Sequence, residues 1–180
     1  MKRVLVGIGL GLGLLGAACG GSKDQPALGQ PSAAHNAADV AFAQGMIPHH
    51  EQAIEMSELA LKQAASPKVK DLATRISAAQ KPEIAKIQGW LDNWAQQVNP
   101  GHGAHGGAGM LGGAEMAQLR QASGPAFDRL FLEGMIRHHE GAVRMAQEEL
   151  DKGQFPDAKQ LARQIITAQQ AEISEMWLLL

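Results

Sequence analysis

The chain has 180 residues and a mass of 19.1 kDa, which is long enough for one domain with a buried core. Its net charge of −2 offers no basic surface to nucleic acid, and an aromatic content of 4% leaves few rings to stack on single-stranded bases. A single cysteine excludes an internal disulfide network and a cysteine-based zinc site. The functional information therefore lies in seven histidines and eight methionines.

Residues 1–18 have the pattern of a secretory signal peptide. A positively charged start precedes an apolar, glycine-rich run that is too short for a stable membrane span. Cys19 follows at the expected cleavage point, in a setting that resembles a bacterial lipobox, so we expect lipidation and a membrane anchor there. Ordinary cleavage after Ala18, which leaves a free thiol, is the alternative. Residues 19–36 are a flexible tether, and the sequence predicts export to the bacterial periplasm or cell surface.

The remaining chain contains the same unit twice. Residues 37–91 align with residues 126–180 without a gap, and 22 of these 55 positions are identical. Apolar residues recur at helical spacing in both units, and Pro67 and Pro156 mark the start of a second helix in each. Each unit is thus predicted to be a helical hairpin. Two such hairpins predict an all-α four-helix bundle over residues 37–180.

Residues 98–113 join the two units and contain seven glycines. This composition predicts a mobile crossover rather than packed structure. His102, His105 and Met110 lie within this segment and constitute a weaker, adaptable candidate metal site.

A His-His-Glu motif occurs once in each unit, at the same position. Adjacent residues of a helix point about 100° apart, so we expect one histidine of each pair to face the bundle axis and the other a neighbouring helix or solvent. Imidazole nitrogen and thioether sulfur suit copper in its two oxidation states. The alternative is ordinary core packing of these side chains. The candidate copper ligands are Met46, His49, His50, Met56, Met135, His138, His139 and Met145.

Four carboxylates accompany these motifs: Asp39, Glu83, Asp128 and Glu172. They are predicted either to accept hydrogen bonds from the imidazoles or to form packing hydrogen bonds between helices. No Glu-x-x-His motif occurs in the chain, so a ferritin-type di-iron oxidase is not supported. The sequence also has no evident constellation for nucleophilic catalysis, and we expect a protein that is not an enzyme.

Three motifs together resemble the exported bacterial family called domain of unknown function 305. They are Met-Ile-x-His-His-x-x-Ala in each unit, Ala-Ser-Gly-x-x-Phe-Asp before the second unit, and Gln-x-x-Glu-Ile in each second helix. The resemblance covers residues 37–180. It implies a ferritin-like four-helix fold and, as in the members with an assigned role, copper binding and copper tolerance outside the cytoplasm. By position, the family motif falls on Met46, His49, His50, Met135, His138 and His139.

The leading hypothesis is a membrane-tethered copper-binding protein that sequesters copper or passes it to an acceptor protein. A second hypothesis is a helical interaction module, in which the His-His-Glu motifs are structural and either support a homodimer or sense pH. A third is a redox enzyme with an open histidine-ligated metal. The metal content of the purified protein discriminates among the three.

Overall fold

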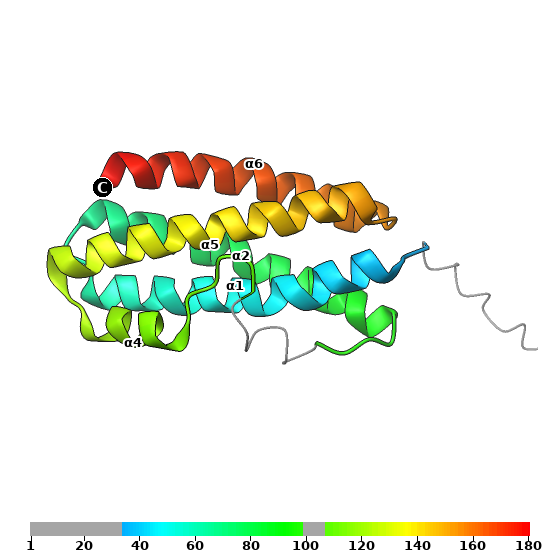
Figure 1. Cartoon of the computed structure of the whole chain (residues 1–180), viewed down its shortest axis with the longest axis horizontal. Helices are drawn as coiled ribbons and strands as arrows, with labels where there is room; N and C mark the ends of the chain where they lie inside the picture. Colours follow the sequence, from blue (N-terminus) through cyan, green and yellow to red (C-terminus); the bar gives the residue numbers. More distant parts are fainter. Residues whose placement is uncertain (1–33, 99–106) are drawn as a thin grey trace, which may run out of the picture. The chain divides into compact units, whose positions relative to one another are not determined.

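The computed structural model describes residues 34–98 and 107–180. The predicted signal peptide, Cys19, His102 and His105 lie outside the described residues. Five helices are described, and their bounds are α1 Ala37–Gln63, α2 Pro67–Asn93, α4 Gly113–Gln121, α5 Gly124–Lys152 and α6 Pro156–Leu179 (Figure 1). The described residues form no strand, which confirms the all-α prediction. None of the described helices combines the length and apolar character that crossing a membrane requires.

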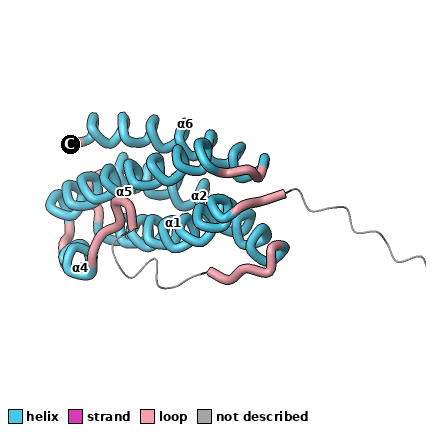
Figure 2. Tube along the Cα trace, turned by 45° about the vertical axis from the view of Figure 1, so that its right-hand side comes forward, coloured by secondary structure: helices cyan, strands magenta, loops and turns pink. Residues whose placement is uncertain are grey.

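The four long helices form two antiparallel hairpins, α1–α2 and α5–α6 (Figures 1 and 2). Contacts are most extensive within each hairpin, and α1 and α5 form the main contact between hairpins. The contact between α2 and α6 is smaller. This arrangement is the predicted four-helix bundle, and it brings the two His-His-Glu motifs together because both lie on the central helices α1 and α5.

The apolar core consists of two clusters. One contains Phe42, Met46 and the end of α2 around Trp90, while the other contains Met56 and the aromatic pair Phe127 and Phe131. Each fully buried large side chain contributes about 1.5–3 kcal/mol through removal of apolar surface from water. Along α1 and α5, the histidines fall between the two clusters, so the polar site is held between two packed apolar regions.

The two hairpins cap each other's second helix. Helices α2 and α6 begin without a hydrogen bond from the side chain of their own N-cap residue. Instead, Asp39 of α1 accepts bonds of 2.9 and 2.8 Å from two amides at the start of α6, and Asp128 of α5 accepts bonds of 3.0 and 2.9 Å at the start of α2. The donors are Gln154, Phe155, Ala65 and Ser66. A carboxylate at a helix N-terminus also interacts favourably with the helix dipole.

The crossover differs from the prediction of a mobile segment, because its described part is packed. We call residues 107–111 the strap. A Cβ atom on Gly141 of α5 would lie 1.5 Å from the carbonyl oxygen of Ala108, so the strap can approach α5 this closely only at a glycine. The side-chain amide of Gln52 accepts a 2.8 Å bond from the backbone N–H of Leu111 and donates a 3.0 Å bond to its carbonyl. The strap is thereby fixed to both central helices.

Helix α4 follows the strap and was not predicted. It is nine residues long and buries only Met116 and Leu119, which leaves little periodicity for a sequence pattern to detect. These two side chains belong to the core cluster that contains Met56. An ion pair of 2.5 Å between Arg120 and Glu55 of α1 holds its outer face. The helix therefore covers one end of the contact between α1 and α5 (Figure 2).

Candidate metal centre

His49 of α1 and His138 of α5 face each other across the contact between the hairpins. They occupy equivalent positions in the two repeats, and their ring centroids lie 3.7 Å apart with an interplanar angle of 40°. Both side chains are buried, with exposed fractions of 1% and 0%. The repeat thus places one imidazole from each unit at the centre of the bundle.

The second histidine of each pair points to the partner helix of its own hairpin. His50 Nε2 lies 2.7 Å from Glu83 Oε2 of α2, and His139 Nε2 lies 2.7 Å from Glu172 Oε2 of α6. Carboxylate acceptors of this kind fix the orientation of a ring and place its proton on Nε2. The structure therefore shows the divergent orientation expected for adjacent histidines, and in the neutral form of either ring this bond leaves the lone pair on Nδ1.

Five buried imidazole nitrogens lack a hydrogen-bond partner among the described residues. They are Nδ1 of all four histidines and, in addition, Nε2 of His138. His49 Nε2–H donates a 3.0 Å bond to the carbonyl of Ala108, so its Nδ1 also carries a lone pair. An unsatisfied buried polar atom costs about 1–3 kcal/mol. Each neutral ring keeps one lone pair, so the four imidazoles offer four buried lone pairs that a metal ion would satisfy.

The central histidines are neutral at physiological pH. Burial removes the water that would solvate a charged ring and lowers the pKa of His49 to about 3. Burial, followed by the repulsion of the neighbouring imidazoles, places the pKa of His138 well below its ordinary value. Neutral imidazole is the form that binds a metal ion. Protonation therefore does not compete for these lone pairs near pH 7.

Methionine sulfur supplies the remaining soft donors. Met46 and Met135 are fully buried and lie three residues before His49 and His138, one helical turn away. Within the described ranges, three or more His, Cys, Asp or Glu side chains do not converge at the spacing of a metal site. An ion held by these imidazoles would therefore need thioether sulfur to complete its ligands.

The other predicted site residues do not share one environment. Glu83 and Glu172 contact histidines, whereas Asp39 and Asp128 bind the amides of the interhelix turns, which is the packing alternative. Met110 lies on the strap and is partly exposed. The remaining methionines named for the site, Met56 and Met145, are fully buried and partly buried respectively. The contact of His49 with the Ala108 carbonyl was not predicted, because a backbone acceptor of this kind has no residue signature.

One groove reaches this site from the surface. It has a volume of about 280 Å³ and runs between α1, α5 and the strap. The buried His49 lines it, together with Met110, Met145 and Glu149. Burial and the neighbouring Asp39 carboxyl raise the pKa of Glu149 to about 8.

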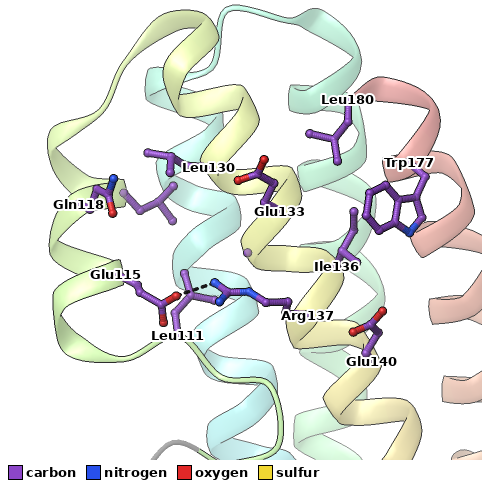
Figure 3. A pocket seen from close by; sticks show the side chains of 12 residues that line it. Leu111, Glu115, Gln118, Leu130, Glu133, Ile136, Arg137, Glu140, Trp177 and Leu180 are labelled. Carbon is purple, nitrogen blue, oxygen red and sulfur yellow. Dashed lines mark hydrogen bonds and ion pairs between the residues drawn. The ribbon is translucent and has the colours of Figure 1, made fainter.

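A larger pocket of about 590 Å³ lies between α4, α5 and α6, and none of its lining residues is a histidine (Figure 3). Trp177 and Leu180 of the C-terminal end lie on the same side of it as Ile136 of α5, and Gln118 of α4 lies on the opposite side. Arg137 forms a 2.6 Å ion pair with Glu115 at the opposite wall. The donors of this pocket are carboxylate and amide oxygens rather than imidazole nitrogens or thioether sulfur, so it does not present the soft donors found at the contact between α1 and α5.

Comparison with solved structures gives relatives over the whole bundle. A DUF305 protein of Streptomyces coelicolor, described as secreted, is 33% identical, with a TM-score of 0.72, and the match covers 77% of this chain and 89% of that chain. CopM in the Cu(I)-bound form is 34% identical, with a TM-score of 0.66 and coverage of 77% and 91%. CopM in the Cu(II)-bound form is 36% identical, with a TM-score of 0.67 and coverage of 77% and 92%. Silver-bound forms of CopM match as well.

A shorter similarity extends to a viral protein. The uncharacterized protein L153 of Acanthamoeba polyphaga mimivirus is 41% identical over 54 residues. That match spans 30% of this chain and 36% of the viral protein. The family profile "Domain of unknown function (DUF305)" matches residues 39–180, which include both hairpins and both His-His-Glu motifs. This chain is therefore a member of the DUF305 family.

Proposed function

We propose that this protein binds copper ions between α1 and α5 and sequesters them or passes them to an acceptor protein. The observation that carries the proposal is the set of five buried imidazole nitrogens without hydrogen-bond partners. The related CopM, which has Cu(I)-bound and Cu(II)-bound structures, supports copper as the metal.

The donor set supports the same conclusion. His50 and His139 are oriented by glutamates, which also increase the basicity of the nitrogen opposite the hydrogen bond. Thioether sulfur at Met46 and Met135 favours Cu(I), and imidazole binds either oxidation state. Copper is the cargo in this proposal. The residues bind and orient it, and we expect no catalytic turnover.

The location follows from the sequence and is also a proposal. A signal peptide at residues 1–18 and a lipidated Cys19 would tether the bundle to a membrane outside the cytoplasm. The described secretion of the Streptomyces relative supports export. Replacement of Cys19 by serine is expected to move the protein from the detergent phase to the aqueous phase. Unchanged partitioning would refute the anchor and leave the copper proposal intact.

The decisive experiment measures copper in matched histidine variants. The protein is purified from copper-supplemented culture, its copper, iron and zinc contents are measured, and Cu(I) and Cu(II) affinities are determined by competition with chelators. His49→Ala combined with His138→Ala is expected to lower copper affinity by at least about tenfold, since two lone-pair donors are lost. His35→Ala is the control, because His35 stacks on Trp94 at a centroid distance of 4.4 Å and no predicted ligand is changed.

Two results would refute the proposal. One is a wild-type protein that binds no copper under these conditions. The other is a double variant that keeps full copper affinity but loses stability or self-association. The second result would favour the interaction module, in which the buried His50–Glu83 and His139–Glu172 bonds serve only the fold.

A further inference from the structure

The repeat creates two equivalent contacts between the hairpins, each formed by a methionine methyl and a glycine. A Cβ atom on Gly134 would lie 3.4 Å from Cε of Met56, and one on Gly45 would lie 2.8 Å from Cε of Met145. Met56 and Met145 occupy the same repeat position, as do the two glycines. In each unit, a methionine therefore packs against the helix backbone of the other unit.

Only one of these two contacts is sealed. Leu111 and α4 cover the Met56 side, where Met116 and Leu119 join the same core cluster and Met56 is fully buried. Among the described residues no helix covers the Met145 side. The groove of about 280 Å³ opens there instead, and Met145 remains partly exposed.

The open groove is lined by two partly exposed methionines and one buried histidine. The part of the chain that the structure describes holds seven methionines, and Met110 and Met145 are the two that are partly exposed. Both line this groove, and so does the buried His49. Phe42 and Ala41 make part of its wall apolar. Thioethers in an apolar wall bind soft ions and discriminate against hard, strongly hydrated ones.

We propose that this groove is the port through which a soft monovalent cation enters, with the thioethers of Met110 and Met145 as its first ligands and His49 as the next. The proposal rests on the proposed function and adds a route to it. The strap forms one wall of the port, and the hydrogen bond from His49 to the Ala108 carbonyl holds the inner ring in place until the ion arrives. The sealed side offers no equivalent path among the described residues.

The test follows Ag(I) uptake by the whole chain in a stopped-flow transfer from a colorimetric chelator. Met110→Leu combined with Met145→Leu is expected to slow uptake by at least about fivefold, and Met116→Leu on the sealed side is the matched control. Ala41→Leu narrows the groove without changing a sulfur, and it is expected to slow uptake while leaving the final amount of bound silver unchanged. Ala37→Leu, exposed on the same helix but outside the groove, is its control.

Slower uptake in both groove variants, with both controls at the wild-type rate, would support the port. Wild-type rates in the groove variants would overturn the port and leave the proposed function standing, as would equal slowing in variants and controls. A wild-type chain that takes up no silver and no copper would overturn both proposals. The final loading of the Ala41→Leu variant separates an obstructed route from a damaged site.

Discussion

Replacement of Glu149 by glutamine tests the electrostatics of the end of the bundle where α5 meets α6. Glu149 is 1% exposed, and its two carboxyl oxygens have no hydrogen-bond partner among the described residues. Burial, followed by the proximity of Asp39, raises its pKa from 4.5 to about 8. The folded protein therefore binds a proton here that the unfolded chain releases above pH 4.5, so this group lowers the free energy of unfolding as pH rises from about 4.5 to about 8.

The size of the effect follows from the width of that interval. Each pH unit between the unfolded and folded pKa values changes the free energy of unfolding by at most about 1.4 kcal/mol, which gives an upper bound of about 5 kcal/mol. Glutamine has nearly the same shape and does not titrate. The variant is expected to match the wild type near pH 5 and to be more stable by about 2–4 kcal/mol at pH 9.

The assay is urea denaturation at constant ionic strength from pH 5 to pH 9. The quantity followed is the free energy of unfolding of the variant minus that of the wild type at each pH. The difference is needed because the depressed pKa of His49 gives a slope of the opposite sign below about pH 6.5. Glu148→Gln is the control, since that side chain is 63% exposed and ion-paired with Lys152. Parallel pH profiles for the wild type and the Glu149 variant would refute the reasoning.

Three further predictions concern the fold. Gly141→Ala is expected to destabilise the protein by about 1–3 kcal/mol, because its methyl would displace the Ala108 carbonyl from the strap. Gly89→Ala should instead stabilise the protein by up to about 1 kcal/mol, because a Cβ atom at this position has no neighbour within 4 Å. Thermal unfolding measures both variants, and a stabilised Gly141 variant or a destabilised Gly89 variant would contradict this reasoning. Asp128→Ala should cost about 1–2 kcal/mol in urea denaturation by uncapping α2, and an unchanged midpoint would contradict the reciprocal caps. A chain that ends at residue 97 should be unfolded or dimeric in ultracentrifugation, because one hairpin leaves its apolar face exposed; a stable monomer would contradict the two-hairpin core.

Much of the fold was predictable because its determinants are local. The apolar spacing within each unit and the prolines at positions 67 and 156 specify helices and their starts without reference to the rest of the chain. The identity between the repeats then fixes which residues are equivalent. Equivalent residues of two repeats that pair about a pseudo-two-fold axis meet at that axis. The juxtaposition of His49 and His138 could therefore be predicted from the sequence.

The features that the sequence did not predict depend on the other hairpin or on the backbone. In the sequence, Asp39 and Asp128 look the same whether they accept a hydrogen bond from an imidazole or from a turn amide. The packing of the other hairpin determines which of these donors they meet. The glycine content of the crossover was interpreted as mobility, although a Cβ atom on Gly109 of the strap would lie 2.1 Å from the carbonyl oxygen of Arg137, so this glycine permits a close backbone approach instead. The buried Glu149 breaks the rule that carboxylates are exposed, so no pattern would have placed it in the core.

The reciprocal caps have a consequence for how such a molecule can arise. Because each hairpin supplies the aspartate that the other requires, a single hairpin could satisfy both caps only by pairing with a second copy of itself in an isologous dimer. In that symmetric ancestor the two ends of the central contact would be identical. Joining the two copies into one chain introduces a connecting segment, and this segment can cover only one of the two ends. Fusion by duplication thus provides the physical means for the two ends to diverge.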